Sequence, residues 1–594
     1  MFLRATKRKK DGKEHRYFSV VENRRVSTGS VVQRTVLYLG EINDSQEAAW
    51  RKSLEVFDEE RTVAATMSLF PADRELPLDE ANAVQVKLTE LELRRPRCFG
   101  NCWLACEVWQ QLGLGEFWSA RLPAGRERVA WSQVLQLLVV NRLIDPGSEF
   151  RLHRQWFDQS AMDELLGSDF AVAGKDRLYR CLDRIVEHKE ELFQHLTQRW
   201  HDLFRAQFDV LLFDLTSTYF EGAAEGIGKA KYGYSRDKRP DCLQVVIALV
   251  VTPDGFPLAY EVMNGNTSEK TTLPGFLKQI EAKYGKAERM WVMDRGIPTE
   301  AILKEMREAE TPVYYLVGTP RSRIGKTEQK WLELPWQKVR DSVEVKLWAD
   351  DGELYVLAKS DGRREKEMAI RRRKLVRLLR TLRAMRRSLP TRDQLLMRLG
   401  EAKGKAGSAY RFVEITQPAK DEAVTKESFK FKLNKAKLHT AEFRDGHYLL
   451  RSNLSAGDPA VLWQRYVQLT EIEAAFRCLK SDLEIRPIYH RTEARVEAHI
   501  FVAFLAYCLM VTLNQRLKVA APGLTGKAVL EKLSTIQMLD VVIPTTDGRS
   551  LEMRRYTQPE KDQQLILNQM KLKLPKQPPP RINARPSEPQ VVNM

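Results

Sequence analysis

Apolar and polar residues alternate near the start of the chain and then change to a helical period. Residues 16–42 alternate around Gly and Ser, which predicts a small β unit. From residue 85 to 205 apolar residues recur at helical spacing, most clearly in 102–114, 130–144 and 176–204. The pattern therefore predicts a β-rich start followed by an all-α region.

Short apolar runs begin at residue 208 and predict a mixed sheet. Residues 208–214 form the first strand, and 243–262 form a hairpin that turns at Pro253-Asp254-Gly255. A helix-like segment at 273–285 leads to strands at 289–294 and 312–320, with helical spacing between them. A hairpin followed by a βαβ unit gives parallel and antiparallel pairs in one sheet.

The segment from 319 to 445 interrupts this alternation and is predicted to be an insertion. It contains a hairpin at 344–360, a very basic helix, and two strands at 410–416 and 428–434. A strand at 445–454 and one long helix at 458–484 then resume the core pattern. The proline-rich residues 571–594 predict a disordered tail.

Length and charge restrict the class of protein. A chain of 594 residues predicts several domains. A net charge of +17 favours a polyanionic partner, although a basic protein without such a partner could have the same composition. Seven cysteines favour a reducing compartment. The basic start lacks the apolar stretch of a secretory signal. The apolar run 500–513 is shorter than the roughly 20 residues of a membrane span, so we expect a buried core helix and no membrane partner.

Three cysteines, Cys98, Cys102 and Cys106, recur every four residues and share one helix face. A closed zinc site needs a fourth ligand, and the sequence shows none nearby. Packing as small core residues is the favoured interpretation, and zinc is the alternative.

Three carboxylates stand where a metal centre needs them. Asp214 closes the run 208–214, Asp294 closes 289–294, and Glu473 lies in the long helix. Hard divalent cations take several carboxylate oxygens from rigid elements, and two such ions support phosphoryl transfer. On an ideal helix Tyr466 and Lys480, seven residues on either side of Glu473, fall within about 20° of it and share its face. Each carboxylate alone could instead be a cap or a surface residue, Tyr466 a packing residue and Lys480 a solvated one.

The arrangement resembles the ribonuclease H-like DDE transposases of bacterial insertion sequences with a tyrosine, arginine, glutamate and lysine signature. Tyr466, Glu473 and Lys480 match that signature, whereas Leu469 stands at the arginine position and Arg477 could replace it. Further similarity lies in the segments 213–222, 232–245, 293–296 and 480–491. Within 232–245, Asp241 is as consistent with capping the loop as with handling the substrate. The long interval from Asp294 to Glu473 fits relatives that carry a β-rich insertion there.

The resemblance implies an α/β fold, with a ribonuclease H-like mixed sheet flanked by helices, a β-rich plus basic-helix insertion and a mainly α-helical amino-terminal region. The expected domains are a β-rich unit (1–60), an α-helical DNA-binding region (61–205), the core in two parts (206–320 and 446–570), the insertion (321–445) and the tail (571–594). It implies catalysis and metal ligation by Asp214, Asp294 and Glu473, with two Mg²⁺ ions and with Mn²⁺ as a substitute. The implied partners are the double-stranded DNA of the element ends and of the target, and a second copy in a synaptic homodimer. A bacterial protein of the cytoplasm and nucleoid is expected.

Several cationic and aromatic side chains are candidates for DNA contact. The resemblance implies that Tyr466 and Lys480 grip the phosphate near the cut and that Arg295 helps to position it. Between Arg363 and Arg387 twelve Lys or Arg oppose two acidic residues, and an apolar stripe predicts a basic amphipathic helix. This helix could follow DNA phosphates, pack on a second copy or cover a core; its candidate contacts are Arg371, Arg372, Arg373, Lys374 and Arg377. In the insertion Trp331, Trp336 and Trp348 fit β-core packing better than stacking on a flipped base.

Three functions are consistent with these residues. The leading hypothesis is a transposase that binds terminal inverted repeats, cleaves there and transfers the strands by a cut-and-paste route. A two-metal nuclease without strand transfer is the second. A DNA-binding protein that has lost catalysis is the third, and the presence of all three carboxylates disfavours it.

Overall fold

A computed structural model describes residues 2–10, 13–25, 31–43, 45–47, 50–51, 86–123, 129–268, 273–275, 277–278, 280, 289–309, 313–320, 323–324, 328–420, 422–546 and 548–583. The chain divides into two compact units. The first consists of Met1–Thr6, Arg16–Arg289 and Gln468–Met594, and the second of Lys7–His15 and Met290–Val467. The helix predicted at 273–285 lies largely outside the described residues.

The first unit contains an antiparallel meander of three strands, β5 (Val210–Tyr219), β6 (Gln244–Val251) and β7 (Pro257–Asn264). Every residue of β6 is buried, which fits its continuous run of β-branched and aliphatic side chains. The predicted hairpin around Pro253 is confirmed as the β6–β7 connection. Asp214 pairs with Leu249 and lies in the middle of β5, so the prediction that it closes the strand is wrong. The buried residues Thr216, Ser217 and Thr218 continue the strand beyond it.

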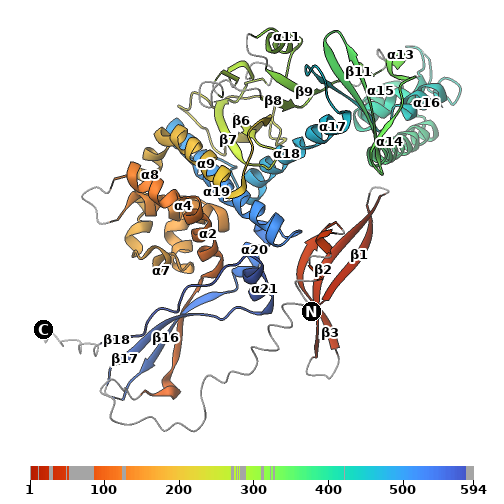
Figure 1. Ribbon diagram of the computed structural model, residues 1–594. Helices are drawn as coiled ribbons and strands as arrows, with labels where there is room; N and C mark the ends of the chain where they lie inside the picture. The colour runs from red at the N-terminus through yellow and green to blue at the C-terminus, as the bar shows by residue number, and fades with distance from the viewer. Residues whose placement is uncertain are drawn as a thin grey trace. The chain divides into compact units, whose positions relative to one another are not determined.

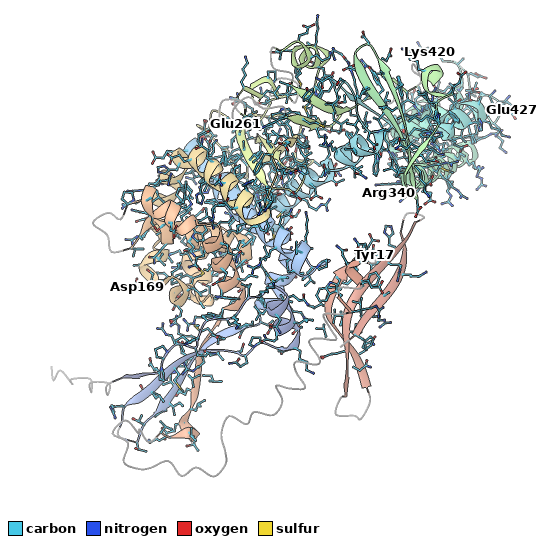
Figure 2. The ribbon with its side chains drawn as sticks, viewed as in Figure 1. Tyr17, Asp169, Glu261, Arg340, Lys420 and Glu427 are labelled. Atoms are coloured by element: carbon cyan, nitrogen blue, oxygen red, sulfur yellow. The ribbon has the colours of Figure 1, made fainter. Side chains whose placement is uncertain are left out.

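Helices cover this meander. The long helix α19 (Glu493–Ala520) lies against α4 (Trp131–Ile144) and α8 (Lys175–Ile185), as Figure 1 shows. It is long and apolar enough to cross a bilayer, but 94% of its most apolar window is buried inside the protein. A helix that is apolar all round belongs in an interior, so the prediction of a buried core helix is confirmed. Lys189 connects three elements, because its Nζ lies 3.3 Å from Glu261 of β7, labelled in Figure 2, and 3.4 Å from Glu497 of α19.

The described part of the first unit contains further helices. Their bounds are α2 Gly100–Gln111, α3 Leu114–Arg121, α5 Glu149–Arg151, α6 Phe157–Gln159, α7 Met162–Leu166, α9 Lys189–Phe204, α18 Leu469–Arg477, α20 Gly526–Leu533 and α21 Lys561–Gln569. Trp50 binds the carboxyl-terminal part of the unit, since its Nε1 donates to the Pro522 carbonyl at 2.6 Å. The small β unit predicted near 16–42 is confirmed as β2 (Lys13–Arg25) and β3 (Val31–Gly40), which pair antiparallel after β1 (Phe2–Lys10).

Two predictions fail at a second sheet of this unit, whose strand order is β18-β17-β16-β4. The region predicted as all-α contains the strand β4 (Glu92–Cys98), which pairs with β16 (Gln537–Pro544). The tail predicted as disordered contributes β18 (Arg581–Asn583), which pairs with β17 (Ser550–Tyr556). Both segments become strands through pairing with residues outside their own local sequence; residues 584–594 lie outside the described part.

The second unit is built on six strands in the order β10-β11-β12-β15-β9-β8. The parallel pair is β8 (Met290–Met293) with β9 (Tyr314–Gly318), and the other neighbours are antiparallel: β10 Gln337–Arg340, β11 Val343–Asp350, β12 Glu353–Ser360 and β15 His447–Ser452. The predicted insertion supplies β10, β11 and β12, and also a helical pair, α14 (Asp361–Ser388) with α15 (Arg392–Ala406). The other elements are α11 Glu300–Glu308, α13 Glu328–Trp331, α16 Lys435–Phe443, α17 Pro459–Val467 and the paired strands β13 Val413–Thr416 and β14 Lys430–Leu433.

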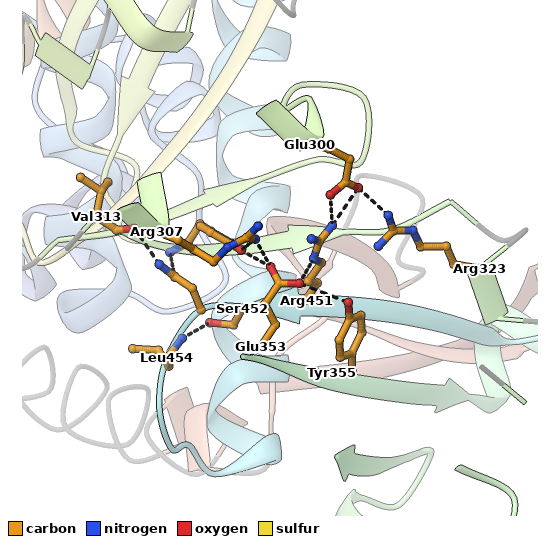
Figure 3. Close-up of polar contacts among 11 residues, drawn as sticks. Glu300, Arg307, Val313, Arg323, Glu353, Tyr355, Arg451, Ser452 and Leu454 are labelled. Atoms are coloured by element: carbon orange, nitrogen blue, oxygen red, sulfur yellow. Dashed lines mark hydrogen bonds and ion pairs between the residues drawn. The ribbon is translucent and has the colours of Figure 1, made fainter. Parts of the chain in front are cut away.

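A charge network centred on the buried Glu353 and Arg451 holds this sheet to α11 (Figure 3). The Glu353 carboxylate accepts hydrogen bonds from Arg307 at 2.7 Å and from Tyr355 at 3.2 Å, and it pairs with Arg451. Arg451 also donates to Glu300 at 2.8 Å. Buried charges need partners, and these cations and anions satisfy one another across three elements. The network fixes the start of α11, six residues after Asp294.

Candidate functional site

Two of the three predicted metal ligands lie on contacting elements of the first unit. Asp214 is half-buried on β5, and Glu473 is exposed on α18. Helix α18 packs against β5 and β6 through its buried residues Ile472, Ala475 and Phe476. This apolar stripe seats the helix as predicted and leaves Glu473 at its edge.

The third ligand, Asp294, lies in the second unit directly after β8, as predicted. Its carboxylate is exposed, and its Oδ1 accepts hydrogen bonds from the Arg295 backbone at 2.7 Å and from the Tyr466 hydroxyl at 3.3 Å. Burial and the neighbouring Asp294 charge raise the pKa of Tyr466, so the hydroxyl keeps its proton and acts as a donor. Tyr466 therefore contacts a predicted metal ligand directly.

The position of Tyr466 depends on a glycine. A Cβ atom at Gly318, the last residue of β9, would overlap the Tyr466 hydroxyl oxygen. Tyr448 lies beside Tyr466, with ring centroids 6.3 Å apart, and the Arg363 guanidinium lies 4.7 Å from the Tyr448 ring centroid. The Arg363 charge also reaches Tyr466, where it opposes the rise of the tyrosine pKa, and the sequence placed this arginine only in the basic run.

The predicted continuous helix around Glu473 is interrupted. Helix α17 ends at Val467, α18 begins at Leu469, and residues Cys478–Asp482 form a π-helical turn. Gln468, with φ −63° and ψ −13°, departs from ideal helical geometry between the two helices. Tyr466, Glu473 and Lys480 therefore lie on α17, on α18 and in the π-helical turn, and the prediction of one continuous helix through all three is wrong. That they share one face stays a prediction.

Lys480 is bound by a carboxylate that the sequence did not indicate. Its Nζ lies 2.8 Å from Asp237 Oδ1, and Arg486 pairs with the same oxygen. The side chains of Lys480 and Asp237 are only 11% and 5% exposed. Burial lowers the pKa of Lys480, and the Asp237 charge opposes that effect. In this structure Lys480 joins the loop that carries Asp237 to the turn after α18.

The other predicted DNA contacts differ in their surroundings. Arg295 and Arg477 are exposed, and Arg477 lines a cavity of about 430 Å³ beside α18 and α19. Along α14 the predicted apolar stripe is buried against α15, while Arg372, Arg373 and Arg377 are exposed and Lys374 is half-buried. Arg371 differs, because it donates to the buried Asp445 at 2.7 Å and serves the fold of the insertion.

The tryptophans and cysteines singled out in the sequence serve packing. Trp331 and Trp348 are buried in one apolar cluster of the second unit, and Trp336 packs against it. In the cysteine row burial raises the pKa of all three thiols, that of Cys106 to about 12. Cys98 ends β4, whereas Cys102 and Cys106 lie on α2, so the expectation that the three share one helix face is wrong. Cys102 is fully buried, which favours packing as the interpretation of this row.

Sequence reasoning missed a buried cluster in the first unit. The ligand atoms of Glu149, His490 and His499 lie within 4.8 Å of one another, next to a cavity of about 410 Å³. His499 Nε2 lies 3.1 Å from the Ile485 carbonyl, and its Nδ1 lies 3.4 Å from Arg142 Nη2. A permanent cation beside Nδ1 disfavours a metal ion there, so this cluster fits a buried ion network better. The signal in the sequence was a pair of histidines nine residues apart.

The three predicted ligands have the chemistry that a hard divalent cation requires, because all are carboxylates on strands or helices or directly beside them. Asp214 and Glu473 belong to the first unit and Asp294 to the second. Convergence of all three around metal ions stays a prediction.

Comparisons with known proteins identify the family. The family model described as "Transposase DDE domain" matches residues 205–509, and that described as "IS1634 family transposase, N-terminal domain" matches residues 3–61. No curated protein matches the chain. Among solved structures, a chain of the piggyBac transposase synaptic complex with hairpin DNA is similar at 10% identity and a TM-score of 0.33, covering 75% of this chain and 82% of that one.

The first match spans more than half of the chain and includes β5, β8 and α18. It confirms the predicted α/β fold class with a mixed sheet and the predicted enzyme class, a divalent-metal-dependent transposase that acts on DNA. The chain belongs to the DDE transposases of insertion sequences.

Proposed function

We propose that this transposase binds the terminal inverted repeats of its element, cleaves the DNA there and joins the ends to a target by a cut-and-paste route. The observation that carries the proposal is the packing of α18 on β5, which brings the helix of Glu473 to the strand of Asp214. Asp294 supplies the third carboxylate, at the end of a strand and with its Oδ1 held by Tyr466. Rigid elements that present acidic oxygens are what metal-dependent phosphoryl transfer requires.

We assign Asp214, Asp294 and Glu473 as ligands of two Mg²⁺ ions, with Mn²⁺ as a substitute. Bound Mg²⁺ polarises the attacking oxygen and offsets the negative charge on the phosphate. The Tyr466 hydroxyl donates to Asp294 Oδ1 and restrains the orientation of that carboxylate. Arg295 and Arg477 are exposed and are assigned to DNA phosphates, as are the exposed arginines of α14.

The proposal also assigns the parts of the chain. Residues 61–205 are the DNA-binding region, 206–320 and 446–570 form the catalytic core, and 321–445 are the insertion. Cleavage at two element ends needs two catalytic centres, so the active species is a homodimer on DNA. Recognition of the ends and capture of a target make double-stranded DNA the partner in both steps.

The test compares charge-neutral variants in a cleavage and strand-transfer assay with a terminal-repeat duplex and Mg²⁺. Asp214→Asn, Asp294→Asn and Glu473→Gln should each lower cleavage more than about 100-fold, because even outer-shell partners of metal ligands are worth about 10- to 100-fold. DNA binding should persist. Asp209→Asn and Glu471→Gln, which change carboxylates next to β5 and on α18, are the matched controls.

Each outcome of this assay assigns a function. Strand transfer by the unaltered protein supports transposition, nicking alone supports a nuclease without strand transfer, and binding alone supports a protein that has lost catalysis. Full activity in any of the three variants removes that residue from the metal site.

A further inference from the structure

The loop between β5 and β6 presents aromatic and cationic side chains to solvent. Tyr232 and Tyr234 are 64% and 86% exposed, although tyrosine gains from burying its ring. Residues 229–239 contain five Lys or Arg and one acidic residue, Asp237. Lys231 and Lys238 are exposed on the same loop. This combination of ring faces and positive charge is typical of surfaces that bind nucleic acid strands.

The first half of the loop is fixed to the meander. Lys231 and Gln244 exchange backbone hydrogen bonds of 3.1 and 3.0 Å, and the buried Gln244 side chain donates to the carbonyls of Tyr234 and Gly265 at 3.2 and 2.8 Å. Gly233 sits directly on the β7 end, because a Cβ atom there would overlap the Gly265 carbonyl oxygen. The backbone on both sides of Gly233 is therefore held, and Tyr232 and Tyr234 project from a rigid support.

The second half of the loop is fixed by the charges around Asp237. This carboxylate pairs with Lys480 and Arg486, and the Arg236 backbone donates to the Ser217 hydroxyl of β5 at 3.3 Å. Both ends of the loop are thus held by elements of the first unit, including the strand of Asp214 and the turn that follows the helix of Glu473. A surface that is already ordered loses little conformational entropy when it binds a ligand.

We propose that residues 231–238 form a platform for unpaired DNA bases. Tyr232 and Tyr234 stack on exposed base faces, and Lys231 and Lys238 contact the adjoining phosphates. In paired duplex DNA the base faces are covered by their neighbours, so the platform engages DNA where the duplex is opened or ends. The platform deepens the proposed function and rests on it for the source of such DNA, the cleaved ends of the element.

The test measures binding without cleavage, so that it stays distinct from the test of the metal site. The full-length protein in EDTA is titrated with a single-stranded oligonucleotide that contains 2-aminopurine, and with the fully paired duplex of the same sequence. The Tyr232→Ala/Tyr234→Ala variant should bind the single strand at least about 30-fold more weakly, because the loss of each of the two base stacks is worth about 5- to 150-fold. Its affinity for the duplex should change less than about threefold.

Matched variants separate stacking from charge. Tyr232→Phe/Tyr234→Phe keeps both rings and should bind the single strand like the unaltered protein. Lys231→Ala/Lys238→Ala should flatten the salt dependence of single-strand binding by about 0.7 for each phosphate that is no longer neutralised, whereas the tyrosine variants should leave that slope unchanged. Circular dichroism verifies that each variant is folded.

Three results would overturn the proposal. Unchanged single-strand affinity in the double alanine variant excludes stacking, and equal losses for single strand and duplex exclude selectivity for unpaired bases. A change in oligomeric state without a change in DNA affinity assigns the loop to contact between copies of this chain.

Discussion

Replacing Asp237 by Asn removes the negative charge that Lys480 and Arg486 share. The substitution keeps the size of the side chain and one carbonyl oxygen, so it tests charge and not packing. Removal of one partner from a buried ion pair costs about 3–5 kcal/mol. Arg486 is 28% exposed and can turn toward water, which favours the lower end of that range. A loss of about 3 kcal/mol is below the total stability of a typical domain, about 5–15 kcal/mol, so the variant should remain folded.

The expected effect is local opening of the loop, and hydrogen exchange measures it. An opening free energy lower by about 3 kcal/mol corresponds to opening that is about 100-fold more frequent. Amides of residues 231–242 that are protected only by the loop should therefore exchange about 100-fold faster in Asp237→Asn, followed by mass spectrometry of peptides. Amides of residues 245–251 in the fully buried strand β6 should exchange as before and serve as the internal control.

The same variant separates two roles for Lys480. If Lys480 holds the loop, Asp237→Asn and Lys480→Met both speed exchange and weaken single-strand binding, and Lys480→Arg restores both. If Lys480 instead binds a DNA phosphate in the complex, Asp237→Asn releases the lysine from its ion pair and strengthens binding to DNA. Unchanged exchange in the loop together with tighter DNA binding would refute the assignment of Lys480 to the loop.

Three other substitutions test contacts that the structure reveals. Gly318→Ala should displace Tyr466 from Asp294 and lower cleavage about tenfold, which is the value of one hydrogen bond to a charged group. Gly400→Ala is the control, because the space around its Cβ is open and cleavage should not change. Equal activities of the two variants would show that Tyr466 does not contribute to the site. The exposed arginines of α14 are Arg372, Arg373 and Arg377. Replacing them by Gln should reduce the slope of log affinity for DNA against log salt concentration by about 0.9 for each phosphate that is no longer neutralised. Arg371→Gln is the control and should lower stability without changing that slope. Burial and Arg142 lower the pKa of His499 to about 3, so its contribution to stability is complete above pH 6.5 and is lost as the pH falls toward 3. His499→Gln should flatten the decline of the urea midpoint over that range, and a parallel decline in both proteins would contradict this assignment.

The sequence alone determined the elements whose pattern is local. The β6–β7 hairpin, the strand that ends before Asp294, the buried stripe of α14 and the burial of α19 all follow from hydrophobic spacing. The family signature also lies in the sequence, because it depends on residue types at fixed intervals. These features can be predicted from local sequence, because the direction of side chains repeats with the period of the helix or strand.

Tertiary structure decided which partners each group found. The strand β4 has five consecutive exposed residues and no alternating pattern, and it forms because β16, more than 400 residues later, pairs with it. The strand β18 also forms through pairing. It lies in the proline-rich tail, whose composition predicts disorder, and it pairs with β17. Backbone hydrogen bonds between separate strands leave no mark in local composition.

The candidate site shows the same division. Sequence named Asp214, Asp294, Glu473 and Tyr466, but only the folded chain places the Tyr466 hydroxyl against Asp294, binds Lys480 to Asp237 and gives Arg371 to Asp445. An ion pair or hydrogen bond depends on the distance between two side chains and on their shielding from water, and neither quantity is encoded in the interval between the two residues along the chain. The chain thus specified its chemistry by residue type, and the fold determined which of those residues remain available to DNA.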